Sequence, residues 1–136
     1  MPIRRVLALL AVAVVGAAPS GCGTVSGREQ AATAAAQRFL DAVADGDGAA
    51  ACAVLAPKTV EELEKSGGAG CSEAILDEDL PEPGDVETAD VYGQWARVVM
   101  SADTVFLAVF PQGWRVVAAG CRPAGEGPYD CVLQGG

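Results

Sequence analysis

The chain has 136 residues and carries 18 acidic against 9 basic side chains, with no histidine and a net charge of −9 at pH 7. This length accommodates a leader and one domain. An acidic surface repels nucleic-acid phosphates and anionic lipid headgroups, so no nucleic-acid partner is expected, and any membrane attachment should come from a lipid alone. The lack of histidine excludes Ser-His-Asp and Cys-His catalytic arrangements and removes the commonest general base.

The first 21 residues have the composition of a secretory signal peptide. Arg4 and Arg5 precede an apolar run over residues 6–18, and Cys22 follows a short segment of small residues. A positive start, a hydrophobic middle and a small-residue cleavage region are typical of such signals. The apolar run is shorter than the roughly 20 residues that a membrane-spanning helix needs. We therefore expect residues 1–21 to be removed, which takes away two of the nine basic residues and none of the acidic ones.

Ser20-Gly21-Cys22, placed after this apolar run, resembles the lipobox of bacterial lipoproteins. In that family the cysteine sulfur receives a diacylglyceryl group and the cysteine becomes the new N-terminus. The resemblance therefore implies lipidation of Cys22 and attachment to the outer face of the cell membrane. Pro19 departs from the family pattern, which usually has an aliphatic residue at this position. The alternative is an ordinary signal peptide cut near Gly16-Ala17-Ala18, which would give a secreted soluble domain with a free thiol.

The cysteine count independently supports lipidation. Five cysteines are present, and an odd number in an exported protein requires an explanation for the unpaired one. Lipidation of Cys22 leaves Cys52, Cys71, Cys121 and Cys131, which can form two disulfides in an oxidising compartment. Of the three connectivities we favour Cys52–Cys71 and Cys121–Cys131, because each closes a short loop; a ring of about 20 residues contributes roughly 3 kcal/mol. With no CxxC motif and no histidine, a zinc site is not expected.

The first half of the mature chain has helical periodicity. Residues 22–28 are predicted to form the lipidated N-terminus and a flexible tether, and an apolar stripe with three- and four-residue spacing then predicts a helix from Arg28 to Asp45-Gly46. Asp47 is expected to cap a second helix, which Pro57 ends. The remaining helical elements predicted here are a short helix over 59–65 and one turn over 71–76.

After an acidic, proline-broken loop at 77–84, the periodicity changes from helical to two. The pattern predicts strands at 86–92, 94–101, 104–110 and 114–121. Short connecting loops make consecutive strands antiparallel neighbours. Residues 122–136 are rich in Pro and Gly and are expected to be irregular. The sequence therefore predicts one α+β domain over 29–136, with helices on one face of a four-stranded antiparallel meander sheet.

The order of these elements resembles the nuclear transport factor 2-like (cystatin-like) superfamily, a domain found in small lipoproteins of the actinobacterial type. The residues that carry the resemblance are Phe39-Leu40 in the first helix, the Gly46-Asp47 break and the closing strand Gly113-Trp114-Arg115-Val116. It covers about residues 29–121 and implies a curved sheet that wraps the first helix around a cone-shaped cavity. The superfamily includes isomerases, dehydratases and binding or dimerisation modules, so the fold alone does not select a function.

Ketosteroid isomerase, a member of this superfamily, combines a tyrosine with two acids in its cavity. Only Tyr92 and Tyr129 are available here, and no paired acids lie on the inward faces of the predicted strands. Asp103 is expected in a turn. No catalytic or cofactor-binding residue is therefore assigned, and an enzyme of this kind is kept only as an alternative.

Two acidic motifs could bind cations. Asp45-x-Asp47 resembles the start of a calcium loop but lacks the later ligands, so a helix cap and a turn explain it better. The run Asp77-Glu78-Asp79, with Glu82, is best interpreted as a solvated loop. No metal site is assigned to either motif.

The aromatic side chains are expected to fill the core, as is usual in a small domain. Alternatively, some line an apolar pocket for a small hydrophobic ligand. The candidate lining residues are Phe39, Tyr92, Trp95, Phe106 and Trp114. The sequence thus favours a non-catalytic envelope lipoprotein that binds a small apolar ligand or another envelope protein, with a homodimer as a further option.

Overall fold

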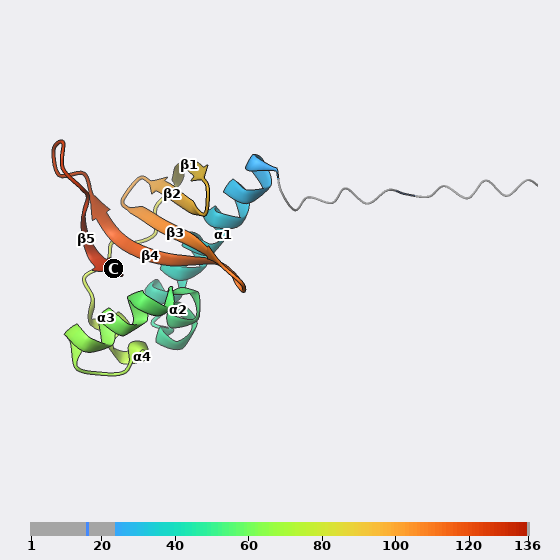
Figure 1. Ribbon diagram of the computed structural model, residues 1–136. Helices are drawn as coiled ribbons and strands as arrows, with labels where there is room; N and C mark the ends of the chain where they lie inside the picture. Colours follow the sequence, from blue (N-terminus) through green and yellow to red (C-terminus); the bar gives the residue numbers. More distant parts are fainter. Residues whose placement is uncertain (1–15, 17–23, 136) are drawn as a thin grey trace, which may run out of the picture.

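The computed structural model, which describes residue 16 and residues 24–135, confirms an α+β domain with helices followed by an antiparallel sheet (Figure 1). The predicted signal peptide and Cys22 lie outside the described residues. The helices are α1 (Val25–Ala44), α2 (Gly48–Val54), α3 (Pro57–Gly67) and α4 (Cys71–Ala74), followed by a 3-10 helix η1 (Ile75–Asp77). The strands, in both chain and sheet order, are β1 (Val86–Tyr92), β2 (Trp95–Met100), β3 (Thr104–Phe110), β4 (Gly113–Arg122) and β5 (Asp130–Gln134). Within the described residues, no helix is both long and apolar enough to cross a membrane.

Helix α1 begins earlier than predicted. The hydroxyl of Thr24 accepts a hydrogen bond of 2.9 Å from the N–H of Gly27, which is the geometry of an N-terminal cap. Residues 25–28, expected in the tether, therefore belong to the helix. The helix ends after Ala44, as predicted, and Gly46 adopts a left-handed φ of 72° just beyond the end.

The segment after α1 follows the predicted order with shifted bounds. The Asp47 carboxylate caps α2 by accepting a 3.0 Å hydrogen bond from the N–H of Ala50, as expected. Pro57, however, begins α3 instead of ending α2, because a proline at the first helical position lacks only an N–H that would have no partner. The predicted disulfide between Cys52 and Cys71 joins α2 to α4.

The prediction of four strands is wrong, because the C-terminal segment is not wholly irregular. Strand β5 pairs antiparallel with β4 after the Pro- and Gly-rich residues 123–129 reverse the chain. Cys121 lies directly opposite Cys131 in this pair, and the two form the second predicted disulfide. Strands β1 and β3 have the predicted bounds.

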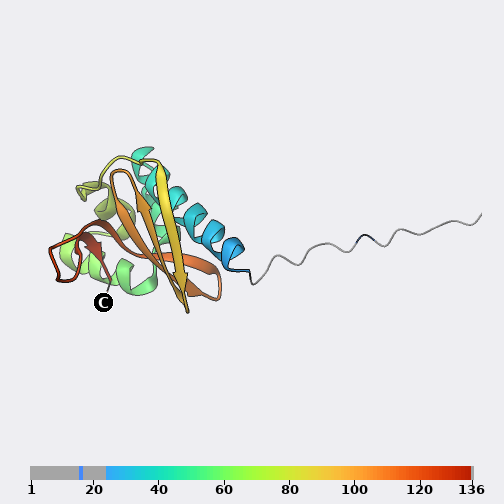
Figure 2. The ribbon, with the colours of Figure 1, turned by 90° about the horizontal axis from the view of Figure 1, so that it is seen from above.

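The core lies between α1 and one face of the sheet. Helix α1 packs across β1, β2, β3 and β4, and α2, α3 and α4 gather at one margin of the sheet (Figures 1 and 2). Phe39 and Leu40 of α1 are buried against the sheet. The buried strand residues of this core include Ala96, Val98, Met100, Val105, Leu107 and Val116. This packing leaves the opposite face of β1, β2 and β3 outside the core.

Gly48 of α2 is a point of close approach between α2 and α4. A Cβ atom at this position would overlap the carbonyl oxygen of Ser72. We expect Gly48→Ala to lower the free energy of unfolding by about 1–3 kcal/mol, because relief of the overlap requires the backbone to move. Urea denaturation measures this change. Gly70→Ala is the matched control, since a Cβ there meets nothing within 4 Å; equal losses in the two variants would contradict the prediction.

Candidate functional site

The five aromatic residues predicted as a pocket lining do not meet in one pocket. Phe39 is fully buried in the core, whereas Tyr92 and Trp95 are 52% and 50% exposed. Phe106 packs edge-on against Tyr129, with ring centroids 5.0 Å apart. Phe39 therefore belongs to the core, whereas Tyr92, Trp95 and Phe106 lie on the outer side of the sheet.

Trp114, the fifth of these residues, lies on the helix side of the sheet. The Arg28 guanidinium of α1 stands 5.5 Å from the centroid of its ring, within the range of a cation–π contact. Trp114 is only partly buried and packs against the core. Trp114 thus contributes to the packing of α1 against β4.

The outer residues form a surface on the strand face opposite the core, which we term the open sheet face. Its members are Thr88, Asp90 and Tyr92 of β1, Trp95, Arg97 and Val99 of β2, and Phe106, Ala108 and Phe110 of β3. The strand register places Tyr92 directly opposite Trp95. The described helices pack against the other face, apart from the start of α3 at the margin formed by β4. Large aromatic side chains are therefore presented to solvent on a support of three paired strands.

Arg97 gives this face a positively charged group with a fixed orientation. Its Nη2 donates a 2.9 Å hydrogen bond to Oδ2 of Asp90, and this hydrogen bond raises the pKa of Arg97. The Nε atom of Arg97 is buried without a hydrogen-bond partner. Because both side chains of the pair are partly exposed, their contribution to stability is at most about 1 kcal/mol. The pair is thus better suited to orienting a guanidinium than to stabilising the fold.

A hollow of about 200 Å³ opens at one margin of the open sheet face. The residues that line it are Ala56, Pro57, Lys58, Thr59, Trp95, Ala108, Phe110, Val117 and Gly135. Most of these are apolar, and the small side chain of Ala108 leaves the space beside Trp95. Pockets for drug-sized ligands measure roughly 300–1,000 Å³. The hollow is therefore matched to one apolar side chain or to a very small ligand.

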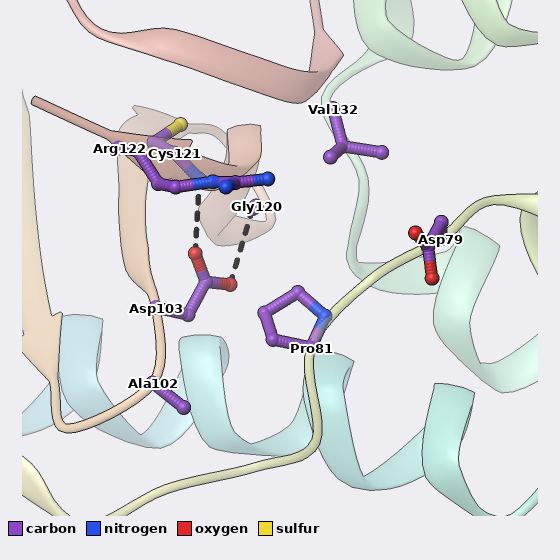
Figure 3. Close-up of a pocket in the computed structure, with 8 residues that line it drawn as sticks. All are labelled: Asp79, Pro81, Ala102, Asp103, Gly120, Cys121, Arg122 and Val132. Carbon is purple, nitrogen blue, oxygen red and sulfur yellow. Dashed lines mark hydrogen bonds between the residues drawn. The ribbon is translucent and has the colours of Figure 1, made fainter. Parts of the chain in front are cut away.

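A second pocket, of about 380 Å³, lies beside the turn between β2 and β3 (Figure 3). Asp103 of this turn is buried, and its two carboxylate oxygens accept hydrogen bonds from the N–H groups of Gly120 and Cys121, at 3.1 and 3.0 Å. Gly120 has a left-handed φ of 65°, which turns the two consecutive N–H groups toward one anion. Burial raises the pKa of the Asp103 carboxyl, while these hydrogen bonds act in the opposite direction.

Asp103 therefore holds the backbone of β4 in place. Both of its oxygens are engaged, and the turn position predicted for it is confirmed. An isomerase-like site would need a carboxyl beside Tyr92, yet Asp103 and Tyr92 lie at opposite ends of β2, and Asp90, on the same strand face as Tyr92, is paired with Arg97. Figure 3 shows Asp79 and Arg122 at the rim of the same pocket.

Within residues 24–135, no group of three or more cysteine, aspartate or glutamate side chains is placed to hold a metal ion. Asp47 acts as a helix cap, as expected. The acidic run at 77–79 falls at the end of η1 and in the loop that follows it.

No known protein family, curated protein or solved structure gives a significant match to this chain.

We expect Asp103→Asn to lower the free energy of unfolding by about 1–3 kcal/mol, because an amide keeps one acceptor oxygen but turns an N–H₂ group against a backbone N–H. Urea denaturation followed by circular dichroism measures the loss. Asp79→Asn makes the same chemical change at an exposed residue of the same pocket and is expected to stay within about 0.5 kcal/mol of the unchanged protein. A tolerated Asp103→Asn would show that the two hydrogen bonds do not stabilise the bend of β4.

Proposed function

We propose that this chain is a lipoprotein of the outer face of the cell membrane, anchored through Cys22, whose domain binds another envelope protein through the open sheet face without catalysis. The observation that carries the proposal is the half exposure of Tyr92 and Trp95, beside Arg97, on a face that the described helices leave uncovered. Tyr, Trp and Arg are the side chains that most often dominate the energy of protein interfaces. Their rigid support by three strands lowers the entropy that binding would cost.

The hollow beside Trp95 supplies a receptor for an apolar side chain of the partner. Lys58 lies at its rim and is paired with Glu61 at 2.9 Å. Arg97, on the same strand face as Trp95, is paired with Asp90 at 2.9 Å. The two cations near the hollow are therefore each matched by a carboxylate. An apolar anchor whose surroundings carry no excess of either charge is the partner chemistry that this surface fits.

We also propose that the domain has the nuclear transport factor 2-like arrangement, in which a sheet wraps the first helix. The passage of α1 across four strands supports this proposal. Phe39 and Leu40 occupy the space between α1 and the sheet, where members of the superfamily with a cavity would hold a ligand. This packing favours a protein-interaction module over a cavity enzyme.

Binding of a small apolar ligand is the second candidate function, and the apolar hollow is the observation that favours it. A volume of about 200 Å³ limits the ligand to a single ring or a short alkyl chain. A secreted soluble form of the same domain would follow if Cys22 were not lipidated.

The intact mass of the mature protein tests the anchor. We expect protein purified from membranes of a native-like host to begin at an acylated Cys22. Its mass should increase by four hydrogens on reduction, because two disulfides are present. A water-soluble product that begins upstream of Cys22 and has a free thiol would contradict the lipoprotein proposal.

Photo-crosslinking tests the interaction surface. A photoreactive amino acid at Thr88, which is exposed on the open sheet face, is expected to give a discrete adduct with one envelope protein in cells. Ala108→Arg should abolish this adduct, because the longer side chain fills the hollow and projects into the interface. The same substitution at Ala31, exposed on α1, is the matched control and should leave the adduct unchanged.

Three other results have distinct meanings. An adduct of twice the mass of the chain would show a homodimer and contradict a different partner. Lack of any adduct, with the protein folded, would contradict a protein-binding role for this face. An adduct that persists in Ala108→Arg would exclude the hollow from the interface.

A further inference from the structure

Two hairpin turns and the start of α1 meet at one end of the domain (Figures 1 and 2). Nη2 of Arg28 donates a 2.6 Å hydrogen bond to the carbonyl oxygen of Gly93, in the turn between β1 and β2. The same guanidinium lies over the ring of Trp114, directly after the turn between β3 and β4. The first turns of α1 are therefore fixed against both hairpins.

This end of the domain, which we term the tip, exposes an unusual amount of apolar surface. Val25, Tyr92, Trp95 and Val109 are 63%, 52%, 50% and 37% exposed. They are four of the six large hydrophobic side chains that are exposed within the described residues. Tyr92 and Trp95 lie on the open sheet face, whereas Val109 is opposite Trp114 on the helix side, so these exposed side chains surround the two turns on both faces of the sheet. Scattered exposed apolar side chains would need no explanation, but four at one end of the domain do.

The tip also has few of the acidic side chains that are frequent in the rest of the protein. Between residues 91 and 122 the only acidic residue is Asp103, which lies in the turn at the other end of the sheet. The acidic loop over 77–85 and residues Glu126 and Asp130 also lie toward that far end, because they precede β1 and follow β4. Near the tip, α1 contributes one charge of each sign, Arg28 and Glu29. Asp90, two residues before Tyr92, is paired with Arg97. Apart from Asp90 and Glu29, most of the negative charge that a membrane surface would repel is therefore held away from the tip.

The length of chain between Cys22 and the helix places the tip close to the proposed anchor. Thr24 already caps α1, so only two peptide units separate it from Cys22, a reach of at most about 7 Å. Arg28, which contacts both hairpins, lies four residues further, or about 6 Å along the helix axis. The headgroup layer of one leaflet is itself about 5–7 Å thick. An acylated Cys22 thus leaves little space between the tip and the lipid surface.

We infer that the tip, composed of Val25, Tyr92, Trp95 and Val109, inserts into the lipid headgroup layer as a second membrane contact beside the acyl chains. This inference rests on the proposed anchorage through Cys22. Trp and Tyr are enriched at membrane interfaces, because each combines an apolar ring with a polar group that stays hydrated. Attachment by lipid and tip together orients the domain, with its acidic end away from the membrane and the open sheet face turned sideways.

Tryptophan quenching by brominated phosphatidylcholine tests the inference, because Trp95 and Trp114 are the only tryptophans. The acylated protein carrying Trp114→Phe, which reports Trp95 alone, is reconstituted in vesicles brominated near the top of the acyl chains. We expect a blue shift and loss of most of the Trp95 emission relative to unbrominated vesicles. The matched control replaces both tryptophans by Phe and places one at exposed Ala102, in the turn at the far end; its emission should not change.

A second preparation separates this inference from the anchor itself. The thiol of Cys22 in non-acylated protein is coupled to a maleimide lipid, and the same quenching is measured on vesicles. This preparation can be made whether or not the native protein proves to be acylated. Quenching of Trp95 in either anchored form supports the inference. If the anchored protein floats with vesicles but Trp95 is not quenched, or if Ala102→Trp is quenched equally, the tip contact is wrong even though the anchor stands. An unacylated native protein contradicts only the proposed anchor.

Discussion

The shape of this domain depends on two irregular points in β4, where distant segments satisfy backbone groups that the sheet leaves free. At Val117 the register with β3 slips, and the carbonyl of Val117 accepts 2.9 Å hydrogen bonds from the Thr59 hydroxyl and the N–H of Gly135. At Gly120 the Asp103 carboxylate binds two successive N–H groups. Because an unsatisfied buried group costs about 1–3 kcal/mol, these contacts specify where the neighbouring elements lie.

The bend in β4 also divides its outer edge between two partners. Its second half pairs with β5, which brings Cys121 opposite Cys131. Its first half instead receives the junction of α2 and α3, through a bridge from Leu55 and a 2.8 Å hydrogen bond from the N–H of Ala56 to the carbonyl of Val116. That junction forms one wall of the hollow on the open sheet face. The hollow therefore exists because the first half of β4 contacts the junction of α2 and α3 instead of β5.

Features determined by local chemistry were predictable from the sequence, and features determined by distant partners were not. The cap at Asp47 and the bounds of β1 and β3 follow from side-chain type and from two-residue periodicity. Strand β5 was not predicted, because it forms only by pairing with β4 and because the Pro and Gly residues around it are typical of irregular chain. The role of Asp103 was missed for the same reason, since its two donors are 17 and 18 residues away. Sequence patterns assigned the aromatic residues to the core, yet pairing in register brings Tyr92 and Trp95 together on the surface.

The asymmetry of the surface links the two proposed contacts. Surface charge increases the solubility of a domain, and exposed aromatic rings decrease it. The exposed rings at one end of this small acidic protein therefore have a cost in solubility. Burial of that end in a headgroup layer removes the cost and leaves Arg97 and Phe106 facing along the membrane, with the hollow at the membrane surface because Trp95 belongs to both contacts. A partner embedded in or attached to the same membrane would then meet this face already oriented, which reduces the rotational freedom lost on association. Rigid attachment of α1 to both hairpins through Arg28 is what allows one anchor to orient the whole domain.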